Sequence, residues 1–418
     1  MIRIKPFKGV HPKAEYAGDI SCPPYDVLTS EEAGDIVSRN PLSFLRVNKP
    51  QLEFAPDINP YSSQVYSRGK DNLKQFIRDG YLVQDNTDNY YIYRVSKGNH
   101  RQTGLAVLLS IEDYNSGVIK KHEYTGKHTV KDRADHMNIL DAQVGPILSA
   151  FKSNQDINEL FDRITSKQPF IQFFAADKTQ HEIWIIDNPD MVNDITNIFS
   201  ELDAIYIADG HHRSHAAHQV FDKRKENNPH HTGDEPYNYY LNILFPEEQL
   251  NIIAYNRLVE DLNGQSLDQF LIECGKSFSV IEISYPYSPQ SLHSFGMYCA
   301  GKWYELVLKE DFIDNDNPIK NIDAGLLYDY LLSPILDIKD PKEDTRLKYM
   351  GGDKKPLNLQ STVDSGEYDI AFTLFPTSMQ QVLDIADIDQ IMPAKSTWFD
   401  PKLRSGLLVY SLEVDSFQ

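Results

Sequence analysis

A cluster of four histidines and one arginine is the first place in the sequence where residue types and spacing favour chemistry. It lies in the segment YIADGHHRSHAAHQV, residues 206–220. The apolar run before Asp209 predicts a buried strand, and Gly210 permits a sharp turn that brings a ligand close to the backbone. A helix predicted to begin near His212 would present N–H groups and a positive dipole end, which suit a phosphate. His212 and Arg213 would add charge-assisted hydrogen bonds there, and Asp209 is a candidate acid or base.

The same segment allows two other interpretations. His211, His215 and His218 are spaced to share one helix face, as in the H-x-x-x-H pattern of zinc enzymes. The glutamate that acts as the base in those enzymes is missing between the first two histidines. The histidines also fit an ordinary polar helix start. A metallohydrolase site and a structural role stay open, while the arginine and the helix N-terminus favour phosphate.

The segment HEYTGKHTVKDR supplies a second set of polar groups. His122 and Glu123 are candidate catalytic residues, with Glu123 as a possible base. Lys131 and Arg133 are candidate phosphate ligands, because phosphoryl transfer depends mainly on positioning and charge neutralisation. The alternative is a solvated surface loop that precedes a helix beginning near Asp132.

A third segment, PPYDVL, places Asp26 in a loop whose backbone is restricted by two prolines. A carboxylate in a stiff loop can act as a general base on a hydroxyl or as a ligand of Mg²⁺. The alternative is a helix-entry turn in which the Asp26 side chain caps backbone N–H groups.

The fourth segment is PAKSTWFDPK, which begins at Pro393. The glycines of a phosphate-binding P-loop are missing ahead of its lysine, so we infer no P-loop. The lysine and two hydroxyls are still candidate ligands for a phosphate or a substrate carboxylate: Lys395, Ser396 and Thr397. A nucleophilic Ser396 activated by Lys395 is the less favoured alternative, because no third group can be assigned.

The elements that must position these residues form a mixed pattern of strands and helices. Residues 62–79 predict an amphipathic helix with Val65, Leu73 and Phe76 inward, and NYYIYRVSKGNHRQTGLAVLLS predicts a hairpin. Frequent hairpins among alternating strands and helices favour an α+β fold with a mixed sheet and flanking helices. We expect three regions: a motif-bearing core at 1–262, a smaller α+β unit at 263–345, and C-terminal strands at 346–418 that return to the core.

Composition excludes several classes of partner. The 418 residues carry a formal net charge of −20, which disfavours nucleic acid and anionic membranes as partners. The three cysteines lack a C-x-x-C spacing, which argues against a zinc knuckle and a disulfide framework. No apolar stretch approaches 18 residues and no apolar leader is present, so we expect a soluble cytoplasmic protein. The oligomeric state is not predicted.

Four ordered motifs resemble a large uncharacterised bacterial family that is often labelled ParB-like. They are RIKPFKGVHP with SCPPYDVLTSEEA, HEYTGKHTVKDR, IADGHHR, and MPAKSTWFDPKLRSGL. The resemblance covers nearly the whole chain. One departure is AYNRLV, where the family pattern has a histidine before the arginine and this chain has Asn256.

The Asp-Gly-His-His-Arg core is also similar to the phosphate-binding turn of the ParB/sulfiredoxin-like superfamily, which includes kinases of free serine. This similarity implies that Gly210, His211, His212 and Arg213 hold phosphate. It implies a phosphoryl-transfer enzyme on a small phosphorylated metabolite, with free serine or phosphoserine as the expected substrate. ATP or ADP and Mg²⁺ are the implied cofactors, and the direction, kinase or phosphatase, stays open. The alternatives are a nucleotide-binding switch or partition protein without turnover, and the metallohydrolase.

Overall fold

The structure, a computed structural model, describes residues 2–314, 316–352 and 354–413. The chain divides into two compact units. Unit 1 comprises residues 1–121, 125–250 and 401–418, and unit 2 comprises residues 122–124 and 251–400. The expected boundaries at 262/263 and 345/346 do not coincide with these, because the strands at 256–259, 347–350 and 370–374 pair with one another inside unit 2.

Unit 1 is built on a mixed sheet of nine strands among the described residues, in the order β6-β11-β8-β12-β5-β4-β10-β9, with β1 paired to β5. The pairs β6–β11 and β8–β12 are parallel and the others are antiparallel. The predicted mixed α+β class is therefore confirmed. The strands of unit 1 are β1 (Ile4–Lys5), β2 (Val10–Pro12), β3 (Leu82–Gln84), β4 (Tyr90–Lys97), β5 (His100–Ser110), β6 (Ile119–Lys120), β7 (Ala142–Gln143), β8 (Ile147–Phe151), β9 (Ile171–Phe174), β10 (Gln180–Ile186), β11 (Ile205–Asp209), β12 (Tyr239–Pro246) and β21 (Tyr410–Ser411).

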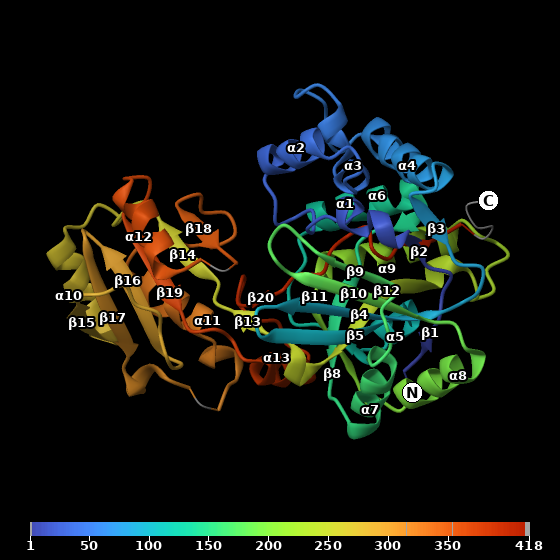
Figure 1. The fold of residues 1–418 in the computed structure, drawn as a ribbon. Coiled ribbons are helices and arrows are strands. Elements are labelled where there is room, and N and C mark those ends of the chain that lie inside the picture. The colour runs from blue at the N-terminus through green and yellow to red at the C-terminus, as the bar shows by residue number, and fades with distance from the viewer. Residues whose placement is uncertain (1, 315, 353, 414–418) are drawn as a thin grey trace. The chain divides into compact units, whose positions relative to one another are not determined.

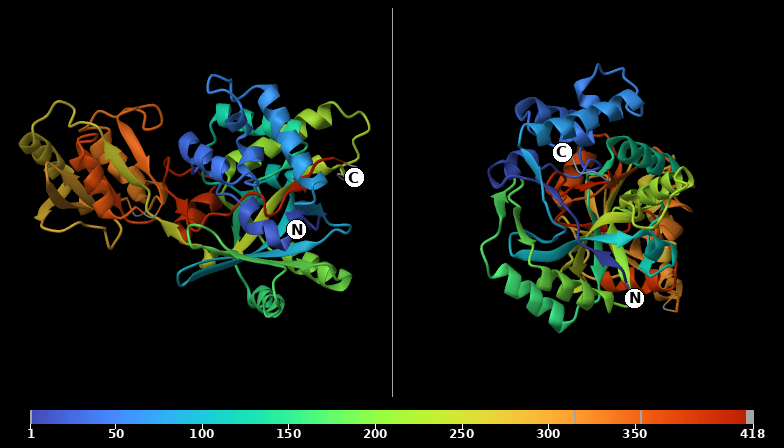
Figure 2. Two further views of the ribbon diagram at one scale, coloured as in Figure 1. Left: turned by 45° about the horizontal axis from the view of Figure 1, so that its top comes forward. Right: turned by 90° about the vertical axis from the view of Figure 1, so that its right-hand side faces the viewer.

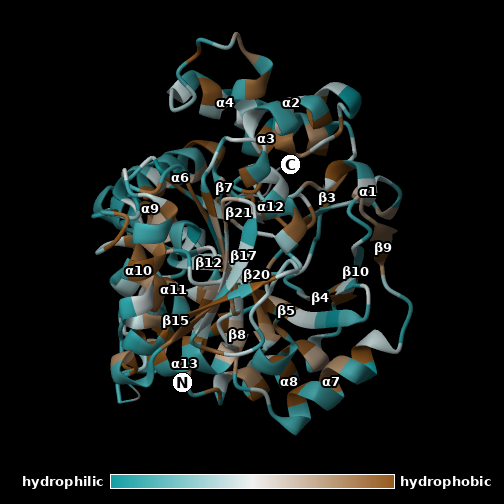
Figure 3. Ribbon diagram, turned by 90° about the vertical axis from the view of Figure 1, so that its left-hand side faces the viewer, coloured by the Kyte–Doolittle hydropathy of each residue, from teal (hydrophilic) through white to brown (hydrophobic). Residues whose placement is uncertain are grey.

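Helices cover both faces of this sheet. Figures 1 and 2 show α7 and α8 on one face and α6 and α9 on the other, with α4 packed outside α6. In Figure 3, α7 and α8 each carry both hydrophobic and hydrophilic positions, as expected for helices with one buried side. The helices of unit 1 are α1 (Ala17–Ile20), α2 (Ser30–Arg39), α3 (Leu45–Asn48), α4 (Ser63–Arg78), α5 (Ile111–Asn115), α6 (Lys127–Leu140), α7 (Gln155–Thr165), α8 (Pro189–Ser200) and α9 (His211–Glu226).

Local sequence signals placed several of these elements correctly. The amphipathic helix predicted at 62–79 is α4, and Val65, Leu73 and Phe76 are buried. The predicted hairpin is β4–β5, and Thr29 caps α2 together with Glu32 in a capping box. The helix predicted near Asp132 begins earlier, at Lys127. The polar residues of its first turns lie on a partly exposed side, so their charge did not prevent helix formation.

Unit 2 has its own antiparallel sheet of six strands among the described residues, in the order β15-β17-β16-β19-β14-β18, while β13 pairs with β20. The segment LNIIAYNRLV, which falls within the expected core at 1–262, supplies β13 and β14 to unit 2 instead. The strands are β13 (Ile252–Ile253), β14 (Asn256–Val259), β15 (Phe278–Ile283), β16 (Ser294–Cys299), β17 (Lys302–Leu308), β18 (Leu347–Met350), β19 (Ile370–Leu374) and β20 (Trp398–Phe399). The helices are α10 (Leu267–Ser277), α11 (Asp323–Leu327), α12 (Pro356–Asp364) and α13 (Met379–Asp387).

None of the helices in the described parts of the chain combines the length and the apolar character needed to cross a bilayer.

A glycine in the C-terminal segment of unit 1 allows a close approach to the core, which gives the first testable prediction. Gly406 has φ +85°, and a Cβ built on it would lie 2.7 Å from Cγ of the fully buried Phe44. We expect Gly406→Ala to lower the free energy of unfolding by roughly 2–4 kcal/mol, through overpacking added to left-handed strain. Gly117 is the matched control, with φ +81° and no atom within 4 Å of the built Cβ. Gly117→Ala should cost roughly 1–2 kcal/mol in urea unfolding. Equal losses would show that Phe44 moves aside.

Candidate functional site

The N-termini of α6 and α9 lie next to each other in unit 1. Gly126 is the N-cap of α6, and its N–H donates to Nε2 of His212 at 3.2 Å. Gly210, with φ +101°, is the N-cap of α9, and Oγ1 of Thr125 hydrogen-bonds with Nδ1 of His215 at 2.7 Å. The positive ends of two long helix dipoles are therefore adjacent, an arrangement that attracts an anion.

These two helices differ from others of the same unit in how they begin. Neither α6 nor α9 has a side-chain cap or an acidic residue in its first turn. Side-chain oxygens of Thr29, Ser62, Asn154 and Asn188 cap α2, α4, α7 and α8 respectively. A glycine N-cap leaves room for a ligand at the backbone, where a capping side chain would otherwise lie.

The carboxylate at the end of β11 organises two cations. Asp209 Oδ2 accepts from Nζ of Lys402 at 3.2 Å and lies 3.8 Å from Nη2 of Arg213. Nη1 of Arg213 also donates to the carbonyl of Pro146. Burial by itself would raise the pKa of Asp209, but the charges of Lys402 and Arg213 and the hydrogen bond from Lys402 outweigh it and hold the pKa well below its usual range. Asp209 is thus a stable anion that fixes the position of Arg213.

A second arginine, from α6, stacks on a tyrosine of the PPYDVL loop. The guanidinium carbon of Arg133 lies 4.2 Å from the ring centroid of Tyr25, and its Nε and Nη2 donate to Oδ2 of Asp132 at 2.9 and 2.6 Å. Tyr66 of α4 donates its hydroxyl proton to Oδ1 of Asp132 at 2.6 Å. Burial, followed by the charge of Asp26, raises the pKa of Tyr25 to about 12, so the phenol is neutral at pH 7.

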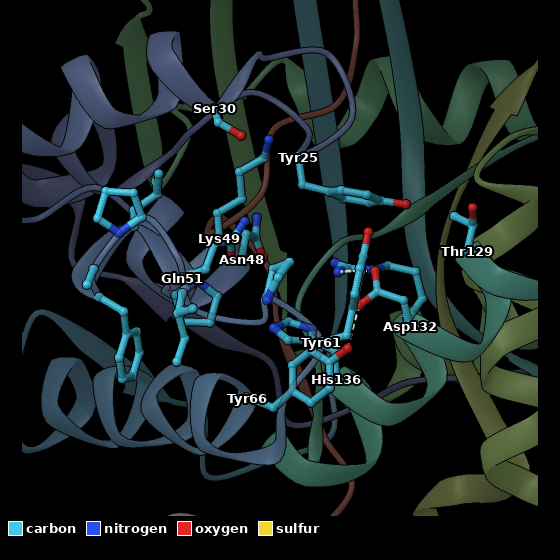
Figure 4. Close-up of a pocket in the computed structure, with 18 of the residues that line it drawn as sticks. Tyr25, Ser30, Asn48, Lys49, Gln51, Tyr61, Tyr66, Thr129, Asp132 and His136 are labelled. Carbon is cyan, nitrogen blue, oxygen red and sulfur yellow. Dashed lines mark hydrogen bonds and ion pairs between the residues drawn. The ribbon is translucent and has the colours of Figure 1, made fainter.

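These groups line a cavity of about 740 Å³ that lies entirely within unit 1. Figure 4 shows that Tyr25 and Lys49 enter it from the N-terminal region, Tyr66 from α4, and Asp132 and His136 from α6. The cavity is within the usual range for small-molecule and cofactor sites. One wall is mostly apolar and aromatic, and comes from the segment between α3 and α4: Pro50, Leu52, Phe54, Ala55, Pro56, Ile58, Pro60 and Tyr61.

A smaller cavity of about 40 Å³ shares part of this lining and extends it toward α9. Tyr25 and Arg133 line both cavities, while Gly145 and Arg213 line only the smaller one. Arg133 and Arg213 therefore line the same small cavity, with Tyr25, from two helices. The charges of both arginines lower the pKa of the Tyr25 phenol, although burial prevails.

Lys49 adds a third cation to the cavity. Its Nζ donates to the carbonyl of Leu28 at 2.9 Å. Burial, and then the charge of Arg133, lowers the pKa of Lys49. Burial likewise lowers the pKa of His136 to about 3, and its Nε2–H donates to the Val47 carbonyl at 3.0 Å. His136 is therefore a neutral structural residue, and the cations facing the cavity are lysine and arginine.

The structure brings together some of the residues predicted from sequence. Arg133 lines both cavities and Arg213 the smaller one, whereas Gly210, His211 and His212 form the start of α9 and line neither cavity. Asp26 is exposed on the turn that carries Tyr25. The side chain of Lys131 is 74% exposed, pairs with Asp135 and does not line either cavity. The remaining candidates belong to unit 2: His122, Glu123, Lys395, Ser396 and Thr397.

The three histidines considered for a metal site have separate roles. His211 is buried, His215 bonds with Thr125, and Nδ1 of His218 lies 3.3 Å from Asp222. Among the described residues, no group of three His, Cys, Asp or Glu side chains is placed to hold a metal ion.

Sequence analysis missed several residues that shape the site. Lys402 lies in the Pro-Lys part of the C-terminal motif, and Tyr25 lies in PPYDVL. Both residues are therefore in recognised motifs, but no local pattern was a reason to assign either a role. Lys49 and Tyr66 carried no local signal, because only the packing of α3 against α4 and of α4 against α6 brings them to the cavity.

Comparisons with known proteins come from solved structures and a family model, since no curated protein matches the chain. A free serine kinase in complex with AMP has 12% identity and a TM-score of 0.35, covering 70% of this chain and 86% of that chain. SbnI with a C-terminal truncation, from Staphylococcus aureus, has 11% identity and a TM-score of 0.40, covering 74% of this chain and 90% of that one. A conserved hypothetical protein from Pyrococcus furiosus has 12% identity and a TM-score of 0.35, covering 71% and 92%.

These similarities are too low to assign a function. The family model is the stronger finding, because it matches residues 4–325, more than half of the chain. The chain therefore belongs to the family described as protein of unknown function DUF1015.

Proposed function

We propose that unit 1 binds a nucleotide or another phosphorylated small molecule and transfers its phosphoryl group. One observation carries this proposal: Arg133 and Arg213 line one small cavity together with Tyr25, and they come from two adjacent helices, α6 and α9, whose N-termini have no side-chain cap. Helix N-termini and arginine forks are the usual means by which proteins hold phosphate oxygens and stabilise a transferring phosphoryl group.

The charge of the cavity supports an anionic ligand. The two cavities are lined by Lys49, Arg133 and Arg213, against the carboxylates of Glu31 and Asp132. This local excess of positive charge contrasts with the −20 of the whole chain, which repels large anions and so favours a small one. The apolar wall at 50–61 offers contacts for the non-phosphate part of the ligand, such as a nucleobase.

The residues have distinct roles in this proposal. Asp209 holds Arg213 and Lys402 in place, because a carboxylate stabilised by two cations is a weak base at neutral pH. The exposed Asp26, next to Tyr25 in the chain, is the candidate base. The acceptor hydroxyl would give its proton to this carboxylate while its oxygen bonds to phosphorus. The bond from phosphorus to the bridging oxygen of the donor breaks, and that oxygen leaves with the electron pair.

Magnesium fits the carboxylates that line the larger cavity. Glu31 and Asp132 supply the hard oxygen ligands that Mg²⁺ prefers, and the ion usually takes only one or two of these besides phosphate oxygens. When bound, Mg²⁺ would neutralise phosphate charge. Glu31 and Asp132 are thus the residues that we propose to hold it.

The substrate implied by the sequence resemblance, free serine or phosphoserine, is the first to test. The protein is incubated with serine and either ATP or ADP, and separately with phosphoserine and ADP, AMP or water, each with and without Mg²⁺. Phosphorus NMR then follows every phosphorylated species. We expect phosphoserine to be made or consumed in at least one mixture, and this reveals the direction of transfer.

Calorimetric titration with ATP, ADP and AMP separates this proposal from its alternatives. Binding without turnover of any metabolite would favour a nucleotide-binding switch. Stoichiometric zinc required for turnover would favour the metallohydrolase. If neither nucleotides nor phosphoserine bind at millimolar concentrations, the proposed function is wrong.

A further inference from the structure

Unit 2 contains a buried arginine that has no acidic partner in the described part of the chain. Arg257 lies on β14, between β18 and β19, and is 2% exposed. Its Nη2 donates to the carbonyl of Lys395 at 2.9 Å, and its Nη1 donates to the carbonyl of Tyr255. Among the described residues, no carboxylate lies within ion-pair distance of this guanidinium. Two of its five N–H donors are given to backbone carbonyls, and no described carboxylate neutralises its charge.

The guanidinium is surrounded by aromatic rings. Its carbon lies 4.5 Å from the ring centroid of Tyr349, the residue directly opposite Arg257 on β18, and 5.8 Å from that of Tyr255. Tyr255 in turn packs edge-on against Tyr349 at 6.0 Å and against Trp398 at 5.2 Å between centroids. These rings are only half-buried, so the cluster reaches the surface of unit 2.

A second cation approaches the same cluster. Lys395 is exposed, and its Nζ lies 5.6 Å from the Tyr255 ring centroid. Its backbone has φ +56°, a left-handed conformation that is unfavourable for a lysine. The carbonyl of Lys395 is also the one that accepts from Arg257. The left-handed backbone of Lys395 and its hydrogen bond with Arg257 thus keep both cations next to the Tyr255 ring.

Burying the charge of Arg257 in this cluster costs free energy unless an anion binds there. Burial lowers the pKa of Arg257 to about 10, which still leaves the guanidinium charged at neutral pH. A buried charge without a counter-ion costs free energy, and the ring faces and backbone carbonyls compensate only part of it. The remaining N–H groups of arginine suit the two oxygens of a carboxylate or a phosphate.

We propose that Arg257 and Lys395, with Tyr255, Tyr349 and Trp398, form an oxyanion-binding site of unit 2 for a small carboxylate or phosphate ligand. The site is separate from the cavity of unit 1, since all five residues lie within 251–400. It does not depend on the proposed phosphoryl transfer. Arg257 would bind the anion directly, Lys395 would add the second charge, and the rings would contact the rest of the ligand.

Trp398 allows a direct test, because it is one of only three tryptophans in the chain. The full-length protein is labelled with 5-fluorotryptophan and titrated with inorganic phosphate or with acetate, at constant ionic strength kept with chloride. Fluorine NMR follows the three signals, assigned by single Trp→Phe variants. We expect the Trp398 signal to shift saturably with phosphate, acetate or both, and the responding anion identifies the preferred chemistry. No saturable shift with either anion overturns the proposal.

Variants decide whether the named residues bind the anion. Lys395→Gln should weaken binding at least threefold, and Arg257→Gln should abolish the saturable shift. Lys276→Gln is the matched control, since it removes one exposed positive charge from α10 of the same unit and should leave the titration unchanged. The Trp303 signal shows whether Arg257→Gln still folds. If that variant does not fold, Lys395→Gln still tests the proposal, because Lys395 is exposed.

A last variant separates the two units. The Trp398 titration should be the same in Arg133→Met, which removes a cation from the cavity of unit 1. Loss of the shift in Arg133→Met, or its persistence in a folded Arg257→Gln, would show that the anion acts elsewhere and would overturn the proposal.

Discussion

Arg213→Met is expected to reduce phosphoryl transfer by about 100-fold to 1,000-fold in kcat/KM. Removing one preorganised charge from the site of a developing anion typically has an effect of this size. Arg213 lines the smaller cavity beside Tyr25 and is held by Asp209 and the carbonyl of Pro146. Calorimetric titration with the active nucleotide should show weaker binding as well, because the phosphate loses a charge-assisted hydrogen bond.

The matched control for Arg213→Met is Lys131→Met. It also removes one positive charge, but from an exposed side chain on α6 that pairs with Asp135 and lies outside both cavities. Its kcat/KM should stay within about twofold of the wild-type value, as expected for a surface ion pair. If both variants lose activity equally, general electrostatic attraction and not the geometry around Tyr25 would explain binding. The result also tests the sequence-based assignment of Lys131 as a phosphate ligand.

The stability of unit 2 is expected to fall as the pH rises from 5 to 8, because of Asp323. This residue is 4% exposed at the start of α11. Its Oδ1 accepts from the N–H of His293 at 3.0 Å, and its Oδ2 has no hydrogen-bond partner among the described residues. Burial raises the pKa of Asp323 from 3.8 to about 7. Below pH 3.8 the Asp323 carboxyl is protonated in both the folded and the unfolded state. The stabilisation that comes from its raised pKa is then fully present.

Between these pKa values the unfolded chain releases the proton while the folded protein keeps it, so the free energy of unfolding decreases with pH. The total change is roughly 4 kcal/mol, of which about 2–3 kcal/mol falls between pH 5 and pH 8. Asp323→Asn removes the titration and should remove this part of the pH dependence. Melting curves of both proteins are recorded by tryptophan fluorescence at pH 5, 6, 7 and 8. The difference in stability between wild type and Asp323→Asn at each pH gives the contribution of Asp323. A difference that does not vary with pH would show that the Asp323 carboxyl is solvated in the folded state.

Local signals in the sequence predicted the elements that carry the Asp-Gly-His-His-Arg segment. The apolar run before Asp209 forms β11, and α9 begins at His211, one residue from the predicted position. Both follow from nearest neighbours in the chain, namely a strand-forming run, a glycine and a helix start. The hairpin β4–β5 and the capped helices α2 and α4 were predictable for the same reason. The mixed α+β class follows from the order of such elements.

The division of the chain depends on contacts that no local pattern encodes. Strand β14 pairs with β18 and β19, which come about 90 to 115 residues later in the chain, and this pairing assigns them all to unit 2. His122 and Glu123 are close to Arg133 in the sequence, yet they belong to unit 2 while Arg133 lies in unit 1. Proximity in sequence therefore did not place these motif residues together.

The sequence by itself determined which short segments carry candidate phosphate-binding residues, because residue type, a glycine turn and a helix start are local properties. Only the tertiary structure decided which side chains share a cavity. Arg133 and Arg213 line one cavity because α6 packs on α9, and Lys402 reaches Asp209 from the far end of the chain. In the sequence, Arg257 is an ordinary strand residue. The fold buries it among aromatic rings, and no described residue supplies a counter-ion. Its charge then becomes informative, because the environment that makes a buried cation costly exists only in the folded protein.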